Sequence, residues 1–160
     1  MNDRGEPSSL DLRDAGVAAS VLDLQRAAYA VEAELIASNE IPQLTETLGE
    51  LQQSTERWIG FTNHGDVIAA VAYETSGDDL VISRLVVSPH HFRQGCGEQL
   101  VRRVLGDVPH NRAIVSTGAA NHPALRLYAK LGFRKLGQEE IVEGLRITYL
   151  ERRSGTRRVR

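Results

Sequence analysis

The chain has 160 residues, of which 41% are hydrophobic and 25% are charged, as in a single globular domain. No apolar run approaches the ~20 residues that span a bilayer, and the one cysteine, Cys96, excludes an internal disulfide. We therefore expect a cytoplasmic protein that has no membrane partner.

The formal net charge of −2 is unevenly distributed, because five arginines lie within residues 152–160. Without them, residues 1–151 carry a formal charge of −7. An acidic body argues against a specific nucleic-acid partner and favours a cationic substrate. We expect a disordered N-terminus over residues 1–8, one domain over residues 9–152, and a basic flexible tail over residues 153–160.

The N-terminal third of the chain reads as helical after a short strand at Leu10–Leu12. The segment Val17–Ile36 is predicted to be a helix, and a second helix is predicted near Leu44–Gln53. The apolar residues of the first helix recur every three or four positions, which predicts one buried face: Val21, Leu24, Ala28, Val31 and Leu35.

The middle of the chain predicts three strands joined by short turns, at Arg57–Thr62, Val67–Tyr73 and Leu80–Val87. Further elements then alternate: a helix at Gly97–Leu105, a strand at Arg112–Thr117, a helix at Pro123–Leu131, and strands at Phe133–Gln138 and Leu145–Glu151. This order predicts a single mixed α/β (α+β) domain.

A polar loop follows the third of these strands, and two glycines, Gly95 and Gly97, lie where the next helix begins. Backbone amides at a helix start have no partner within the helix and attract anions. Glycines also let a ligand approach the backbone closely. The two glycines at the helix start, with the positive charge of Arg93, thus predict an anion site. A Walker loop is excluded, because its lysine is absent.

The loop resembles motif A of the GNAT acyltransferases, Q/R-x-x-G-x-G/A after a strand and a proline, although Phe92 stands where the family usually has Gln or Arg. Downstream, residues 121–133 resemble motif B, N-x-x-A-x-x-L-Y-x-x-x-G-F, with agreement at Asn121, Ala124, Leu127, Tyr128, Gly132 and Phe133. The resemblance covers roughly residues 55 to 150.

The resemblance implies a mostly antiparallel sheet, splayed in its middle, with helices on both faces. It implies acetyl-CoA as cosubstrate, with its pyrophosphate on the amides of Arg93, Gln94, Gly95, Cys96, Gly97 and Glu98. The phenol of Tyr128 is then expected near the coenzyme sulfur, as general acid for the thiolate, and Asn121 is expected to contact the cofactor. Homodimers are common in the family.

Strand residues Leu85, Val86 and Val87 are also expected to contact the cofactor. The two-residue alternation breaks between Ile82 and Leu85, which predicts a β-bulge. In the family, such a bulge admits the pantetheine arm. We expect backbone amides near Val86 and Val87 to stabilise the oxyanion.

Acyl transfer to an amine requires the neutral amine, and at pH 7 an amine of pKa ~10.4 is neutral in only about one molecule in 2,500, a cost of about 4.6 kcal/mol. Glu74, which closes a buried strand, is the best candidate for the base, although a solvent-facing strand end is an equally good interpretation. The next strand has no carboxylate at 82–84, so a water held by Glu74 or Ser83 is a further alternative.

Other candidates are set aside. His90 and His91 lack neighbouring ligands and are interpreted as surface residues, so we expect no metal. Cys96 is interpreted as a packed thiol. Tyr29 and Glu32 are placed to line the acceptor cleft, although the sequence gives no direct sign of it. We expect a small-molecule amine as acceptor. A protein lysine or N-terminus, and a non-catalytic acetyl-CoA sensor, are the alternatives.

Overall fold

The computed structural model describes residues 5–36 and 42–154, without the side chains of Ile36 and Pro42. In chain order the elements are β1 Ser8–Ser9, α1 Ala15–Ile36, η1 Pro42–Leu44 (a 3-10 turn), α2 Leu48–Gln52, β2 Arg57–Asn63, β3 Asp66–Ser76, β4 Asp79–Val87, η2 Pro89–His91, α3 Cys96–Asp107, β5 Arg112–Gly118, α4 His122–Lys130, β6 Arg134–Val142 and β7 Leu145–Arg153.

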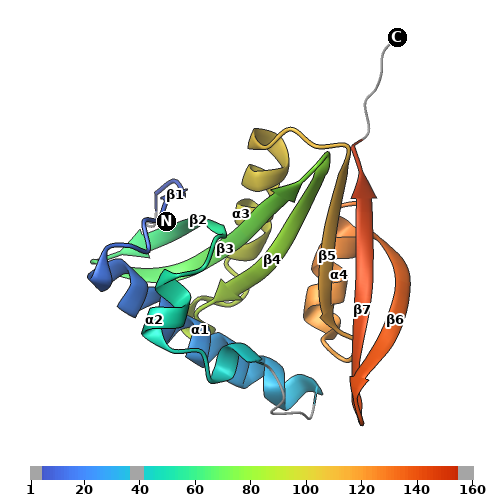
Figure 1. The fold of residues 1–160 in the computed structure, drawn as a ribbon, viewed down its shortest axis with the longest axis horizontal. Coiled ribbons are helices and arrows are strands. Elements are labelled where there is room, and N and C mark those ends of the chain that lie inside the picture. The colour runs from blue at the N-terminus through green and yellow to red at the C-terminus, as the bar shows by residue number, and fades with distance from the viewer. Residues whose placement is uncertain (1–4, 37–41, 155–160) are drawn as a thin grey trace.

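These strands form one seven-stranded sheet in the order β1-β2-β3-β4-β5-β7-β6. Every neighbouring pair is antiparallel except β4 and β5, which run parallel. Helices α1 and α2 cover one face of the sheet and α3 and α4 cover the other (Figure 1). The predicted mixed, mostly antiparallel fold with helices on both faces is therefore confirmed.

Each face of the sheet buries its own hydrophobic core. On one side, Leu100, Val101 and Val104 of α3 pack with Tyr128 of α4 and the inward residues of β2 to β5. On the other, residues of α1 and α2 pack against the sheet around Trp58. The central strand β3 is buried on both faces over residues 67–72, which explains its unbroken apolar sequence.

Local signals set the ends of α4, as the sequence predicts. The Asn121 side chain caps the helix by accepting a hydrogen bond from the Ala124 amide at 3.3 Å, which satisfies one of its unpaired donors. At the other end, Gly132 adopts a left-handed backbone (φ 94°), the conformation that terminates helices. These two residues fix where the helix stands on the sheet.

The predicted stripe on α1 holds only in part. Val21 and Leu24 are buried, but Leu35 is 46% exposed, and Tyr29 and Ala33 are buried instead. Four residues are slightly more than one 3.6-residue turn, so residues spaced four apart rotate gradually around the helix axis. The buried face of α1 therefore moves away from the predicted stripe. The C-terminal half of α1 thereby presents Tyr29 and Glu32 to the pocket.

The chain ends differ slightly from prediction. The first strand is Ser8–Ser9 instead of Leu10–Leu12, and it pairs with β2 at Gly60 and Ile59, so the expected disorder of residues 1–8 is wrong for Ser8. At the other end, β7 continues to Arg153. The rest of the expected segments, residues 1–4 and 155–160, lies outside the described residues.

Candidate active site

The central feature of the site is a seam between β4 and β5. The two strands pair only from Asp79–Arg112 to Ile82–Val115, and beyond that point they separate (Figure 1). The register of β4 against β3 shifts where the seam opens: Tyr73 pairs with Ile82, and Ala72 pairs with Arg84. Ser83 is thus the extra residue of a β-bulge, which confirms the predicted break in alternation.

The hydrogen-bond register decides which β4 amides face this gap. Bonding alternates along an antiparallel pair, so every second residue points away from its partner strand. The Ser88 amide donates to the Ile68 carbonyl at 2.8 Å, and Val86, opposite Ala70, belongs to the same set. The amides of Leu85 and Val87 therefore point toward the gap, whereas the Val86 amide, one of the two expected donors, faces β3.

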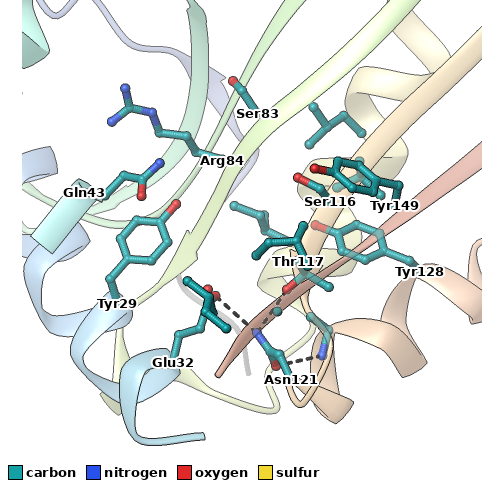
Figure 2. Close-up of a pocket in the computed structure, with 17 residues that line it drawn as sticks. Tyr29, Glu32, Gln43, Ser83, Arg84, Ser116, Thr117, Asn121, Tyr128 and Tyr149 are labelled. Atoms are coloured by element: carbon teal, nitrogen blue, oxygen red, sulfur yellow. Dashed lines mark hydrogen bonds between the residues drawn. The ribbon is translucent and has the colours of Figure 1, made fainter. Parts of the chain in front are cut away.

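A pocket of about 320 Å³ lies where the strands separate. Its walls come from α1, β4, β5, α4 and β7, and Figure 2 shows that Tyr29 and Glu32 lie across it from Tyr128 and Tyr149. The lining residues are Tyr29, Glu32, Gln43, Ile82, Ser83, Arg84, Leu85, Val115, Ser116, Thr117, Gly118, Asn121, Ala124, Tyr128, Leu145, Ile147 and Tyr149.

Glu32 of α1 and Asn121 of α4 meet across the floor of the pocket. The Asn121 amide nitrogen donates to the Glu32 carboxylate at 3.1 Å and lies 3.3 Å from the Thr117 hydroxyl (Figure 2). Burial raises the pKa of Glu32, and the hydrogen bond from Asn121 opposes that rise only partly. A carboxyl group whose pKa moves toward neutrality is a better proton acceptor for catalysis.

Two tyrosines project into the pocket from opposite walls (Figure 2). Tyr29 is 7% exposed and Tyr128 is 4% exposed. Within the described part of the chain neither hydroxyl has a hydrogen-bond partner. Burial, reinforced by the charge of Glu32, raises the pKa of both phenols far above the usual value, so both remain protonated donors at neutral pH.

Arg84 of β4 forms one end of the pocket and is held by a buried ionic network. Its Nη1 atom donates to Glu46 at 2.6 Å and to Gln25 at 2.9 Å, and Nη2 lies 2.9 Å from Glu56. The guanidinium also lies 5.4 Å from the centre of the Trp58 ring, a cation–π distance. This network links β4 to α1, to β2 and to the segment before α2.

The predicted anion loop leads into α3. Helix α3 begins at Cys96 with Gly95 as its N-cap, and no side chain caps its amides. Gly95 and Arg93 both have left-handed backbones (φ 79° and 66°), and a non-glycine residue in that region marks local strain of the kind found at ligand sites. Arg93 and Gln94 are exposed here, whereas Cys96 is buried in the core.

Gly97 sits one residue into α3, against the strand that borders the gap. A Cβ atom added there would be in ordinary van der Waals contact with Leu85 at 3.5 Å and Val87 at 3.7 Å, so the start of the helix lies close to β4. Glu98 instead turns away to ion pairs with Lys130 and Arg102. The loop thus offers backbone groups, and its acidic side chain is already paired.

The structure does not bring Glu74 to the pocket. Its carboxylate is exposed and accepts a hydrogen bond from the Thr55 hydroxyl at 2.8 Å. Glu74 pairs with Val81, on the stretch of β4 where the seam to β5 is still closed. Ser83 does line the pocket, but its hydroxyl contacts Glu56 and the Ala72 carbonyl.

Sequence reasoning placed Tyr128, Asn121 and Leu85 at one site, and the structure brings these three together with Glu32. It missed the network around Arg84, although an arginine in the middle of an apolar strand was a usable signal, because such a charge requires partners. It also missed Ser116 and Thr117 of β5, because no sequence motif marks these two residues.

A known family matches this chain over most of its length. The model described as "Acetyltransferase (GNAT) family" matches residues 19–133, and the chain belongs to that family. The chain is also similar to UPF0157 protein YqkA of Bacillus subtilis (strain 168), at 36% identity over 140 residues. The match covers 85% of this chain but only 40% of that relative's length.

Solved structures show the same fold. The ribosomal-protein-S18-alanine N-acetyltransferase of Escherichia coli superposes with a TM-score of 0.72 at 17% identity, over 92% of both chains. PaiA N-acetyltransferase of Thermoplasma acidophilum, solved in complex with coenzyme A, has a TM-score of 0.72 at 13% identity, over 93% of this chain and 98% of its own.

Two features are absent from residues 5–36 and 42–154. In these ranges, no three His, Cys, Asp or Glu side chains are gathered as a metal ion requires. No helix there combines the length and apolar character needed to cross a membrane.

Proposed function

We propose that the protein transfers an acetyl group from acetyl-CoA to a primary amine of a small molecule. The observation that carries the proposal is the seam, which opens beyond Ile82–Val115 directly onto a pocket lined by Glu32 and Tyr128. A thioester held in the gap would meet a carboxylate on one side and a phenol on the other.

Backbone groups are proposed to hold the cofactor. The α3 amides beyond Gly95 suit the pyrophosphate, because helix starts attract anions. The amides of Leu85 and Val87 face the gap, so they suit the pantetheine arm and the thioester oxygen. A backbone donor aimed at the developing oxyanion contributes to the rate without rearranging during the reaction.

Glu32 is proposed as the general base, in place of Glu74. It lines the pocket, its Asn121 partner fixes its orientation, and burial raises its pKa. A positioned base offsets part of the about 4.6 kcal/mol needed to supply a neutral amine at pH 7. The carboxylate that β4 lacks is thus supplied from α1, which favours an enzyme over a non-catalytic acetyl-CoA sensor.

Tyr128 is proposed to donate a hydrogen bond to the departing thiolate. Its phenol is buried, points into the pocket and keeps its proton because of its raised pKa. The amine nitrogen then attacks the thioester carbon directly, and the C–S bond breaks as the tetrahedral intermediate collapses. Cys96 is 1% exposed and packs in the core, so an acyl-enzyme on that thiol is not proposed.

The first experiment is calorimetric titration of the protein with acetyl-CoA. We expect micromolar binding, lost in Gly95→Asp, because a carboxylate would repel the pyrophosphate. Gly65→Asp is the matched control, since Gly65 is also left-handed (φ 85°) and open on all sides. Loss of binding in both variants, or no binding by the wild type, would refute the proposed cofactor site.

A coupled assay of free thiol release over a panel of amines then tests catalysis. Turnover with any small amine supports the proposed transfer. Tight acetyl-CoA binding without turnover across the panel would instead support the sensor or an acceptor on a protein.

A further inference from the structure

We propose, on the basis of the acetyl transfer proposed above, that the acceptor is a small alkyl amine with a second positive charge and no carboxylate, such as a diamine or polyamine, in preference to an amino acid. Among its described residues the pocket offers no free cation to bind a carboxylate, because the guanidinium in its lining, Arg84, is already held by Glu46 and Glu56, and the lining also carries the carboxylate of Glu32.

The first step concerns Arg84, the cationic residue among the described lining residues. An amino-acid acceptor needs a cation for its carboxylate, and a bidentate arginine is the usual solution. Arg84 already engages Glu46, Glu56 and Gln25, and its side chain is only 11% exposed. A substrate carboxylate would have to displace one of these buried partners and would leave it unpaired.

The second step concerns the balance of charge. Among the described lining residues the charged ones are Glu32 and Arg84, and Arg84 is held by two carboxylates that lie behind the lining, Glu46 and Glu56. The pKa of Glu46 is lowered, because the hydrogen bonds from Arg84 and Gln25 and the charge of Arg84 outweigh its burial. The positive charge of Arg84 is thus offset by its own partners, and the carboxylate of Glu32 is the lining charge left to attract a cationic acceptor.

The third step concerns the two buried phenols. Tyr29 and Tyr128 project into the pocket, are more than nine-tenths buried, and have no hydrogen-bond partner for their hydroxyls in the described ranges. Neither hydroxyl oxygen is itself fully buried, so both are open to a ligand in the pocket. A neutral phenol oxygen accepts an ammonium N–H, and the ring face attracts a cation.

Steady-state kinetics on a matched pair of acceptors tests this inference. Cadaverine and lysine differ only in that lysine carries a carboxylate at one end. We expect kcat/KM for cadaverine to exceed that for lysine by at least about tenfold, or about 1.4 kcal/mol, with most of the difference in KM, because Glu32 repels the carboxylate and Arg84 is not free to bind it. Putrescine and ornithine give an independent pair.

A variant locates the cause. Glu46→Gln keeps the shape and one acceptor oxygen but removes a negative charge and loosens the hold on Arg84. We expect it to reduce the preference for cadaverine over lysine severalfold. Glu140→Gln is the control, because Glu140 is exposed on β6 and pairs only loosely with Arg146, at 3.5 Å. It should retain the wild-type preference.

The outcomes separate this inference from the function on which it rests. Lysine acetylated as efficiently as cadaverine would overturn the charge argument and leave the acetyl transfer standing. An unchanged preference in Glu46→Gln would overturn the role of the Arg84 network. Calorimetric binding of acetyl-CoA without turnover of either amine would overturn the inference alone if another amine of the panel is acetylated, and would overturn the proposed catalysis as well if none is.

Discussion

At the scale of single residues, Glu32 is held by a hydrogen bond from Asn121 at 3.1 Å in a half-buried position. Replacement by glutamine keeps that hydrogen bond but removes the proton acceptor. We expect Glu32→Gln to lower kcat by about 10² to 10⁴-fold, the usual range for a general base. In pH–rate profiles the acid limb due to Glu32 should disappear; a profile that keeps its wild-type shape would contradict this role.

The same substitution should affect stability with the opposite sign. Burial raises the pKa of Glu32 in the folded state, so its contribution to stability is present below the unfolded pKa of about 4.3 and is lost as pH rises through the folded pKa. Glu32→Gln avoids that loss. Its Tm should equal the wild-type value near pH 4 and exceed it at pH 8, as thermal denaturation at both pH values can show.

Tyr128 is the other residue with a specific chemical role. Tyr128→Phe keeps the ring and its edge-to-face contact with Phe133, at 5.4 Å between centroids, and removes only the hydroxyl. We expect kcat to fall by about 10²-fold, as for loss of one transition-state hydrogen bond. The affinity for acetyl-CoA and the circular dichroism spectrum should stay unchanged, and full retention of kcat would remove the role.

Residues of this kind were predictable to different degrees. Tyr128 and Asn121 belong to a local pattern on one helix, so sequence spacing was enough to place them. Glu74 was chosen because it ends a buried strand. It pairs with the beginning of β4, whereas the seam opens toward the end of β4, and only the register reveals this. Arg84 is far in sequence from its partners Glu46 and Glu56 and meets them only through tertiary packing.

At the scale of elements, β4 has two hydrogen-bonding sides with different partners. We expect Leu85 and Val87 amides to exchange with deuterium rapidly in the free protein and to become protected when coenzyme A binds, because they face the gap. The Val86 amide should be slow in both states, since it belongs to the β3 ladder. Residue-resolved exchange by NMR measures this, and a change confined to Val86 would contradict the register argument.

Elements were easier to predict than their ends. The long periodic helices and the apolar strands of the sheet follow from sequence pattern alone. The second helix is shorter than predicted, because Thr47 and Glu50 form a capping box that starts α2 at Leu48, four residues late. Tertiary pairing with β2 likewise decides that the first strand is Ser8–Ser9.

At the scale of the whole molecule, the two cores lie on opposite faces of one sheet, so they should unfold together. Leu51 in one core and Leu100 in the other are both fully buried. We expect Leu51→Ala and Leu100→Ala each to lower the free energy of unfolding by about 2–5 kcal/mol. Trp58 fluorescence reports one core and far-ultraviolet circular dichroism reports the sheet, and both transitions should coincide in every variant.

The seam has a thermodynamic meaning beyond catalysis. It leaves β1 to β4 and β5 to β7 as two leaves of a sheet that share a short ladder, from Asp79–Arg112 to Ile82–Val115. The pantetheine arm of coenzyme A contains amide groups, so it can act as a surrogate strand where the ladder stops. Ligand at a hundred times its Kd adds about 2.7 kcal/mol to stability, which would make the persistence of this protein depend on the supply of its own cosubstrate.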